Sequence, residues 1–317
     1  MKKKLLLVAL VLCCLAPAWA AEYPEKPIEL MVPSPPGGGT DIAIRLLAEL
    51  TEPFLKQKLV VVNKPGGGGT VGVSLLTQAK PDGYSLGGVW NSPLTASPHT
   101  LQVAYTPDDY QPIIQISSAA YVLCAAPDFP ANNAAELIAE LKKNPGKYTY
   151  GNDGVGGTMQ LAGERIFKAL GVKVRPVPFG GAGETAKNFL GGHITFYGGS
   201  VPPIMPHIKA GKAKALLLTS AADNLALPTA SGLKALGIPQ EETVLWRAII
   251  APKGLPPAIL NRLEAAFRQG ASQQRFKDFL QEQGEEALIV GSADLSRLIK
   301  AEYSALGEVA KELGLKK

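Results

Sequence analysis

Short apolar runs alternate with amphipathic segments along the first part of this chain. The runs are rich in β-branched residues, which is typical of buried strands, and the segments between them carry apolar residues at helical spacing. The expected strands are Ile28–Val32, Leu59–Val62 and Tyr84–Trp90, and the expected helices are Asp41–Leu55 and Val71–Ala79. The alternation of three strands with two helices predicts a parallel sheet.

A second unit of the same kind follows, and then a helical tail. Its expected strands are Tyr121–Ala125, Tyr148–Gly151, Val174–Pro178, His193–Tyr197 and Ala213–Thr219, with helices at Ala134–Lys143, Met159–Leu170, Glu184–Leu190 and Val201–Ala210. In the tail we expect a strand at Ala248–Ala251 and helices at Pro256–Gln269, Gln273–Gln283 and Ala293–Lys311. Because no linker rich in proline and glycine separates the two units, we expect strands that cross between two lobes instead of a tether.

The first twenty residues have the order of a secretory signal. Lysines at positions 2–4 precede an apolar run from Leu5 to Leu15, and small residues surround Trp19. We expect cleavage after Ala20 and an exported, soluble chain. The apolar run is shorter than the roughly 20 residues that a membrane-spanning helix needs. A lipid anchor at Cys13 or Cys14 is disfavoured, because neither cysteine follows the small residues of a lipidation site.

Charge and cysteine usage narrow the class of protein. The formal net charge of +5 includes the three signal lysines, so the other side chains carry 5 − 3 = +2, with both signs interspersed. This pattern argues against nucleic acid as a partner. Cys124 is the one cysteine beyond the signal, so no internal disulfide is expected. Its apolar strand predicts a buried thiol without chemistry.

The chain offers few groups for catalysis or metal binding. His99, His193 and His207 are its three histidines, and none has a second ligand at metal-binding spacing. The sequence also lacks the Gly-x-Ser-x-Gly turn that carries a nucleophilic serine. We therefore expect no enzyme activity, no metal and no cofactor.

Two glycine-rich turns, Pro35–Asp41 and Pro65–Thr70, each join a strand of the first unit to a helix. Glycine lets backbone N–H groups approach an anion closely, and the following helix adds the positive end of its dipole. Asp41 is well placed to cap the first helix. Ligands of open α/β sheets bind at the carboxyl ends of strands, so a carboxylate is the expected guest. Nucleotides are disfavoured, since neither turn has their phosphate-binding motifs.

Two more glycine-rich turns follow strands of the second unit, at Gly151–Thr158 and Phe179–Gly183. Two lobes with facing helix N-termini would hold a dicarboxylate, one carboxylate on each lobe, without an arginine. A purely structural role stays open for each turn, because glycine commonly follows a strand for backbone reasons alone.

These turns and several other motifs together resemble the tripartite tricarboxylate transporter substrate-binding receptors, also called Bug receptors. The resemblance covers nearly the whole chain after the signal. Its motifs are Tyr23-Pro24-Glu25-Lys26-Pro27-Ile28, Pro36-Gly37-Gly38 with Asp41, Asn63-Lys64-Pro65-Gly66, Pro81-Asp82-Gly83-Tyr84, Asn144-Pro145-Gly146-Lys147, Gly157-Thr158, Gly191-Gly192-His193-Ile194, Ala210-Gly211-Lys212 and Ala251-Pro252-Lys253-Gly254.

The resemblance implies a type II periplasmic-binding-protein fold, with two α/β lobes joined by crossing strands and a ligand cleft between them. Residues 1–20 are then the signal peptide, residues 21–120 and 247–317 form lobe 1, and residues 121–246 form lobe 2. The implied function is a monomeric periplasmic receptor. It would capture a small organic carboxylate, either a di- or tricarboxylate or an aromatic acid, and deliver it to a membrane permease.

The resemblance also implies the binding residues. In lobe 1 the matching positions are Ser34, Gly37, Gly38, Gly39, Thr40, Asp41, Asn91 and Ser92. In lobe 2 they are Gly154, Gly156, Gly157, Thr158, Gly180, Gly181 and Ala182, whose backbone amides would carry the charge, with Ser200 at a strand end beside them. Trp90, Phe179 and Tyr197 lie next to these positions and would face the ligand body or pack in the core.

One departure from the family bears on the ligand. Family members commonly have an aspartate near the strand end where this chain has Tyr197 to Ser200, and another where Thr195 stands. If the first of these receives a ligand ammonium, its absence disfavours an amino acid and favours a plain or aromatic carboxylate.

Two other functions stay open at this level. The same cleft could belong to a secreted enzyme that acts on a carboxylated substrate, which turnover of a bound carboxylate would reveal. It could also belong to a ligand-sensing partner of a membrane kinase, and loss of uptake on deletion would separate transport from sensing.

Overall fold

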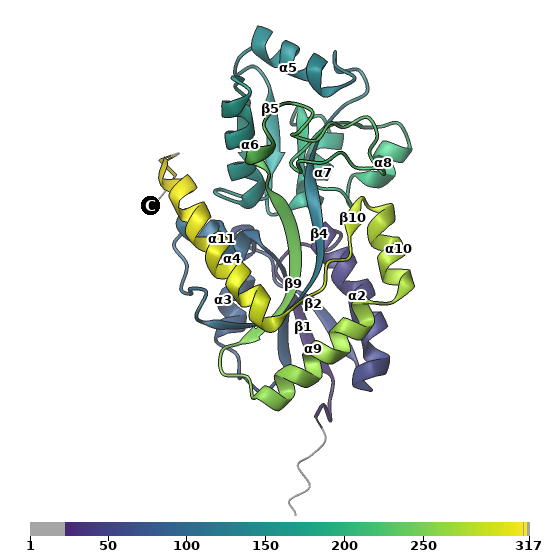
Figure 1. Ribbon diagram of the computed structural model, residues 1–317, viewed down its shortest axis with the longest axis vertical. Coiled ribbons are helices and arrows are strands. Elements are labelled where there is room, and N and C mark those ends of the chain that lie inside the picture. The colour runs from purple at the N-terminus through teal and green to yellow at the C-terminus, as the bar shows by residue number, and fades with distance from the viewer. Residues whose placement is uncertain (1–22, 313, 316–317) are drawn as a thin grey trace, which may run out of the picture.

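The computed structural model describes residues 23–312 and 314–315. The expected signal peptide, its cleavage site after Ala20 and the candidate lipid anchors Cys13 and Cys14 lie outside the described residues. The described chain forms two α/β lobes joined by long strands that cross between them, which confirms the expected architecture (Figure 1). Within the described ranges, no helix is both long and apolar enough to cross a membrane.

The lower lobe in Figure 1 is built on three parallel strands, β1 (Ile28–Val32), β2 (Leu59–Asn63) and β3 (Ser85–Trp90). β1 lies between the other two and pairs with both. The helices α2 (Gly39–Leu55) and α3 (Thr70–Thr77) connect these strands, so the predicted alternation is confirmed. Because the three strands are parallel, the turns that follow them all lie at the edge of the sheet that faces the upper lobe.

Two long antiparallel strands cross between the lobes. They are β4 (Tyr110–Ala125), which has 16 residues, and β9 (Val244–Pro252), and they pair along the whole length of β9. The sequence pattern predicted only the ends of these strands. The rest of β4 escaped detection because it buries polar residues, Gln115 and Ser117 among them, and so does not read as an apolar run.

The upper lobe continues the sheet. Its strands are β5 (Thr149–Asn152), β6 (Arg175–Pro178), β7 (Phe196–Ser200) and β8 (Lys214–Leu218), and its helices are α5 (Ala134–Lys143), α6 (Thr158–Ala169), α7 (Ala182–Leu190) and α8 (Met205–Lys209). β5 pairs in parallel with β6 and β7, whereas β7 and β8 pair with β4 in antiparallel. β7 lies three residues further along the chain than predicted. Its last part contains Gly198 and Gly199, which do not read as strand residues in the sequence. A Cβ atom at Gly198 would lie 2.5 Å from the carbonyl oxygen of Gly151 on β5, so the close pairing of these strands requires glycine.

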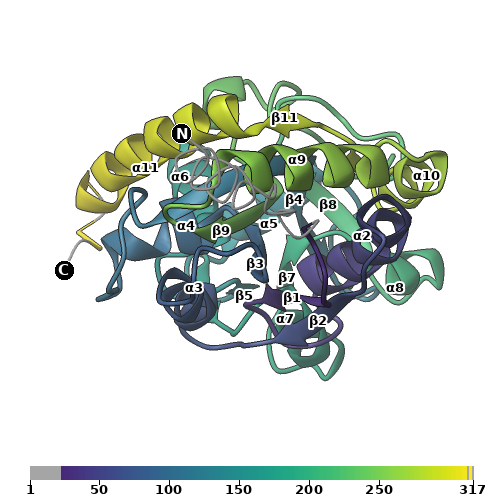
Figure 2. The ribbon, with the colours of Figure 1, turned by 90° about the horizontal axis from the view of Figure 1, so that it is seen from below.

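The chain returns to the lower lobe with α9 (Pro257–Ala271), α10 (Gln274–Glu282) and α11 (Ser292–Glu312). Between α10 and α11, the short strands β10 (Glu285–Glu286) and β11 (Val290–Gly291) pair with β4. α9 and α11 lie along one side of the crossing strands, as the view from below shows (Figure 2). The remaining helical elements are short: α4 (Ser92–Thr95) and the 3-10 turns Gly67–Gly69, Ser97–His99 and Pro239–Glu241.

The tail helix α11 contacts both lobes. The carboxylate of Glu302 accepts hydrogen bonds from Thr95 Oγ1 at 2.7 Å and Asn91 Nδ2 at 2.9 Å, which fix the helix to the lower lobe, and from Trp246 Nε1 at 2.6 Å. About one turn later, Leu306 packs against Leu161 on α6 of the upper lobe. The two lobes are therefore linked by this apolar contact as well as by β4 and β9.

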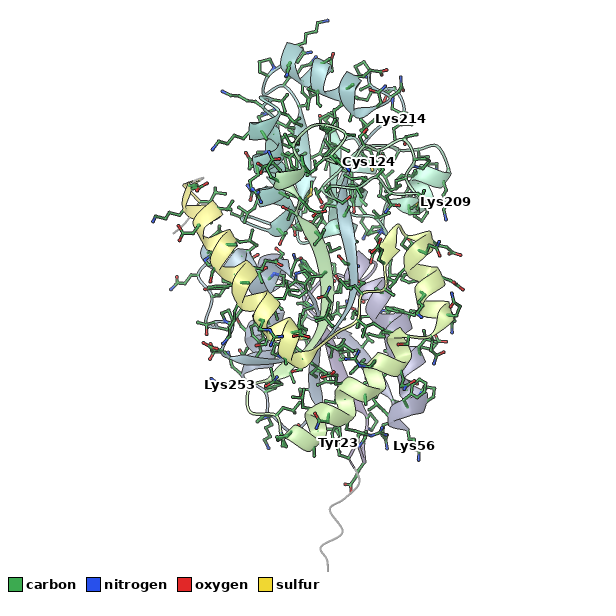
Figure 3. All side chains as sticks on the ribbon, viewed as in Figure 1. Tyr23, Lys56, Cys124, Lys209, Lys214 and Lys253 are labelled. Atoms are coloured by element: carbon green, nitrogen blue, oxygen red, sulfur yellow. The ribbon has the colours of Figure 1, made fainter. Side chains whose placement is uncertain are left out.

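Each lobe has an apolar core of its own. In the lower lobe β1, α2 and α9 pack together, and in the upper lobe β4, β5, β7 and α6 do so. Cys124 lies within the upper lobe (Figure 3) and is fully buried, which confirms the expectation of a buried thiol. Burial raises the pKa of this thiol, so the group stays protonated and unreactive.

Gly270 on α9 packs directly against Thr51 on α2. A Cβ atom at Gly270 would lie 2.2 Å from Thr51 Oγ1 and 3.2 Å from Thr51 Cα, so rotation of the threonine side chain cannot relieve the whole clash. We expect Gly270→Ala to lower the free energy of unfolding by about 1–3 kcal/mol through overpacking. Helix propensity alone predicts that the same substitution raises the free energy of unfolding, since alanine is favoured over glycine in a helix by about 1 kcal/mol.

Urea unfolding of Gly270→Ala beside the exposed neighbour Gln269→Ala decides between these effects. The Gln269→Ala protein should be as stable as the wild type or slightly more stable. A Gly270→Ala protein more stable than the wild type would show that α2 and α9 separate without cost.

Candidate ligand-binding site

A small pocket lies between the two lobes. Turns and strand ends from both lobes meet around it, as expected for ligands of α/β sheets. Its lining residues are Ser34, Pro35, Gly38, Gly39, Thr40, Trp90, Tyr121, Asp153, Gly181, Ala182, Gly183, Gly199, Ser200 and Leu245.

The N-terminus of α2 forms one wall of this pocket. The helix begins at Gly39, two residues before the predicted start, and its N-cap residue Gly38 has no side chain with which to cap it. The first N–H groups of a helix have no carbonyl partner within it, and they carry the positive end of the helix dipole. Gly38 N–H donates to the carbonyl oxygen of Pro35 at 3.4 Å, so the N–H groups of Gly39 and Thr40 form the anion-binding wall.

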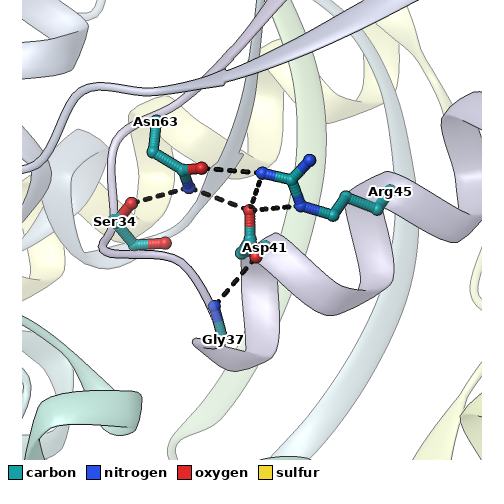
Figure 4. A network of polar contacts seen from close by, with 5 residues as sticks. All are labelled: Ser34, Gly37, Asp41, Arg45 and Asn63. Atoms are coloured by element: carbon teal, nitrogen blue, oxygen red, sulfur yellow. Dashed lines mark hydrogen bonds and ion pairs between the residues drawn. The ribbon is translucent and has the colours of Figure 1, made fainter.

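Asp41 shapes the turn before α2 (Figure 4). Its Oδ2 atom accepts a hydrogen bond from the N–H group of Gly37 at 2.9 Å, and its Oδ1 atom accepts from Arg45 Nε at 3.0 Å. Asn63 Nδ2 donates to Asp41 Oδ1 at 2.8 Å and to the carbonyl oxygen of Ser34 at 2.9 Å. The network holds the turn against β2 and turns the carboxylate away from the pocket.

The electrostatics of this network keep Asp41 ionised. Burial alone would raise its pKa, but the hydrogen bonds from Arg45, Gly37 and Asn63 outweigh burial and hold the pKa below its ordinary value. Asp41 lies in the first turn of α2 and accepts a hydrogen bond from the Gly37 N–H group, which precedes the helix. The prediction that Asp41 caps the helix is therefore corrected, because the N-cap residue is Gly38.

Arg247 on β9 lies next to the α2 wall and was not among the sequence-predicted residues. It is fully buried, its Nη1 atom pairs with Glu285, and its Nε atom donates to Thr40 Oγ1 at 3.3 Å. Among the described residues, its Nη2 atom has no hydrogen-bond partner. A Cβ atom at Gly39 would lie 2.9 Å from Nη2, so this donor is beside the helix N-terminus. The sequence signal that could have identified Arg247 is its charge, which interrupts the apolar run Val244–Ala251.

The glycine turn between β5 and α6 is arranged differently from the α2 wall. Gly154 N–H donates to Asn152 Oδ1 at 3.1 Å, and Gly156 N–H donates to Gln160 Oε1 at 2.5 Å. Gly157 N–H donates to the carbonyl oxygen of Gly154 at 3.0 Å. These amides are used within the upper lobe itself, so they are not free to hold an anion in this arrangement.

Asp153 belongs to the same turn and lines the pocket, whereas Gly154, Gly156 and Gly157 do not. Its Oδ1 atom accepts a hydrogen bond from the N–H group of Met159 at 3.1 Å, whereas its Oδ2 atom has no hydrogen-bond partner in the described part of the chain. The residue is 4% exposed. Burial raises the pKa of its carboxyl group to about 6, although the Met159 amide and the nearby side chains of Ser92 and Trp90 act to lower it. Neither of those two side chains lies in hydrogen-bond geometry with Oδ2.

The structure brings seven of the predicted residues into the pocket lining. They are Ser34, Gly38, Gly39, Thr40, Gly181, Ala182 and Ser200. The other nine lie outside the lining, and they are Gly37, Asp41, Asn91, Ser92, Gly154, Gly156, Gly157, Thr158 and Gly180. The chain itself uses several of them: Asn91 Nδ2 donates to Glu302, and Gly180 N–H donates to Glu184.

Of the three aromatic residues expected near the site, Trp90 lines the pocket. The phenol of Tyr197 is buried and donates to the carbonyl oxygen of Ser200. Residues 23–312 and 314–315 contain no cluster of three or more His, Cys, Asp or Glu side chains of the kind that holds a metal ion.

The lobes touch each other around the pocket. Thr158 N–H on α6 donates to Ser92 Oγ in the lower lobe at 3.0 Å, and Thr100 Oγ1 donates to the carbonyl oxygen of Val155 at 3.2 Å. At the pocket wall, a Cβ atom at Gly39 would lie only 2.4 Å from Ser200 Oγ of the upper lobe. The described arrangement is therefore closed, and glycine at position 39 permits it.

Comparison with known proteins gives a consistent result. Residues 43–315 match the model of the tripartite tricarboxylate transporter family receptor. A UPF0065 protein of Bordetella pertussis strain Tohama I is 33% identical over 304 residues, which cover 94% of this chain and 93% of that protein. The solved structure of the periplasmic binding protein BugD has a TM-score of 0.87 at 31% identity and covers 93% of this chain and 100% of BugD. That of R. palustris Rpa4515 with adipate has a TM-score of 0.87 at 25% identity, covering 92% and 99%. The fold is that of the periplasmic binding proteins.

Replacing Asp153 tests the environment of its carboxyl group. Because its pKa in the folded protein is about 6, above the value near 4 of an unfolded chain, the ionised form destabilises the fold at every pH above 6. Asp153→Asn removes that charge while its amide oxygen still accepts from Met159. We expect this variant to be more stable than the wild type by about 2–3 kcal/mol at pH 8, with the advantage fading between pH 6 and pH 4.

Urea unfolding at the two pH values provides the measurement. The exposed Asp128→Asn is the matched control and should show no such pH-dependent gain. An Asp153→Asn protein less stable than the wild type at pH 8 would contradict the buried, disfavoured carboxylate.

Proposed function

The chain belongs to the tripartite tricarboxylate transporter receptor family, and on this basis we propose that it captures a small organic carboxylate in the periplasm and delivers it to a membrane permease. The family consists of solute-binding receptors, which argues against a catalytic role. The predicted signal peptide supports export, and the family supports a tripartite permease as the membrane partner. We expect the receptor to act as a monomer.

One observation carries the carboxylate assignment. The N-terminus of α2 lines the pocket, and the unpartnered Nη2 atom of Arg247 lies directly behind it, 2.9 Å from where a Cβ atom at Gly39 would be. Helix N-termini bind anions through free N–H groups, and a guanidinium presents planar donors that suit a carboxylate. Ser34 Oγ, buried in the same wall, also has no hydrogen-bond partner among the described residues. A ligand carboxylate would satisfy all three kinds of donor at once.

The adipate in R. palustris Rpa4515 supports the same ligand class, because that protein shares this fold over most of both chains. A di- or tricarboxylate and an aromatic acid both fit the proposal. Trp90 and Leu245 give the pocket apolar lining that the body of either ligand would contact.

Closure of the cleft is the proposed mechanism of capture. Residues 121–246 would move as one lobe against residues 21–120 and 247–317, with the hinge in β4 and β9. A ligand that contacts both walls favours the closed form, because only there does it gain all its contacts. The permease would then read the closed shape.

Gly39→Ala tests both the site and the closure. The added Cβ atom would meet Ser200 Oγ at 2.4 Å and Ser200 Cβ at 3.3 Å, so it keeps the lobes apart where the carboxylate would sit. We expect carboxylate affinity to fall by about tenfold or more, since a loss of about 1.4 kcal/mol already has that effect. The measurement is a thermal-shift screen with mono-, di- and tricarboxylates, aromatic acids and amino acids, followed by calorimetry of the hit.

Gly38→Ala is the matched control. Its Cβ atom would meet Pro35 O at 3.4 Å and Ser34 Oγ at 3.5 Å, which are ordinary contacts, so affinity should change little. If the wild type responded to none of these acids, the receptor proposal would be wrong. If Gly39→Ala bound as tightly as Gly38→Ala, the site would lie elsewhere.

A further inference from the structure

The two lobes bring groups of different charge to the pocket. The lower lobe presents the N–H groups at the start of α2, with the Arg247 guanidinium buried beside them. The upper lobe presents the Asp153 carboxyl group, which can only accept hydrogen bonds when it is ionised. A dicarboxylate held by one carboxylate on each lobe would therefore place its second carboxylate against an acid.

The position of Asp153 is fixed by its surroundings. Its Oδ1 atom is bound to the Met159 amide at the start of α6. A Cβ atom at Gly157 would lie 2.4 Å from Oδ1 and 2.9 Å from the carboxyl carbon, so the backbone of the turn packs closely against the carboxyl group. Because this geometry is set within the upper lobe, Oδ2 is a preformed acceptor at the pocket.

A buried acceptor without a partner is costly, and the cost is larger for a charged group. The neighbouring amides of Gly154 and Gly156 are already bonded to Asn152 and Gln160, so they do not compensate this charge. A ligand that donates a hydrogen bond to Oδ2 would relieve the cost, whereas a ligand without a donor would leave the acceptor buried and unpaired.

Resting on the proposed receptor function, we propose that Asp153 makes this receptor selective for carboxylates that carry a second, hydrogen-bond-donating group. The ligand carboxylate binds at the α2 wall beside Arg247, and a hydroxyl or ammonium group on its carbon chain donates to Asp153 Oδ2. Asp153 is thus a specificity-determining residue supplied by the β5–α6 turn.

This assignment reverses one expectation from the sequence. The missing aspartates at Thr195 and at the Tyr197–Ser200 strand end disfavoured an amino-acid ligand. The structure places a different acid, Asp153, at the pocket from the neighbouring strand β5. An acidic group does face the ligand, although it comes from another turn.

Calorimetry with matched acids tests the proposal, at about pH 8, where Asp153 is ionised. Succinate, malate and aspartate share one skeleton and carry hydrogen, hydroxyl or ammonium at C2. An aromatic set consists of phenylacetate, mandelate and phenylglycine. A short-chain set consists of propionate, lactate and alanine. Tricarballylate and citrate form a tricarboxylate pair that differs by one hydroxyl group. In whichever set binds, we expect a donor-bearing acid to bind about tenfold or more tightly than the unsubstituted acid. Preference for the ammonium member would identify an ion pair, and preference for the hydroxyl member a neutral donor.

Two variants complete the test. Asp153→Asn places an N–H group at the Oδ2 position, so it should lose the preference while still binding the unsubstituted acid. Glu184→Gln removes an exposed acid from the first turn of α7 and should keep the preference.

The outcomes separate this proposal from the receptor function. Affinities within about threefold across a binding set, which is less than 1 kcal/mol, would overturn the selectivity and leave the receptor function intact. A preference that survives in Asp153→Asn would also overturn the selectivity and leave the receptor function intact. So would binding of the unsubstituted acids alone that tightens as the pH falls through 6, because the Asp153 carboxyl group would then act as a hydrogen-bond donor. Absence of binding by every acid would overturn the receptor function, and the selectivity with it.

Discussion

The antiparallel pairing of β4 with β9 is the constraint on which the rest of the structure depends. The sheet of the lower lobe continues outward from β9 through β3, and the sheet of the upper lobe continues outward from β4 through β7. The parallel strands of each lobe then end at the edge that faces the other lobe, and the turns that follow them become the walls of one pocket. In the proposed capture mechanism, the same pair would serve as the hinge, because a strand pair bends more readily than it separates.

The pair also carries charge to the pocket. Arg247 reaches the α2 wall from the middle of β9, and its partner Glu285 comes from β10, which pairs with β4. A buried guanidinium needs such a partner, since an unpaired charge in the interior would destabilise the fold strongly. The positions of the guanidinium beside the α2 wall and of Asp153 directly after β5 are therefore both fixed by the sheet.

Much of the fold could be predicted from local sequence patterns, but the atoms that face the pocket could not. The strands and helices around Ile28–Leu55 follow from apolar periodicity, and the site at the strand ends follows from glycine after a strand. Whether a glycine turn holds an anion depends on where its N–H groups find acceptors. For Gly156 the acceptor is the side chain of Gln160, and for Thr158 it is Ser92 of the other lobe. The first contact is local, four residues apart, and depends on the rotamer of Gln160, whereas the second is set by tertiary packing, which no turn motif encodes.

The contact between Leu306 and Leu161 has a consequence for the protein without ligand. The contact joins α11, fixed to the lower lobe through Glu302, to α6 of the upper lobe. If the lobes open as proposed, these two leucines would separate and expose apolar surface to water. The balance between the open and closed forms without ligand would then depend partly on a contact outside the pocket. A ligand would have to supply only the remaining free-energy difference, so a substitution at this contact would change apparent affinity while the pocket stays unchanged.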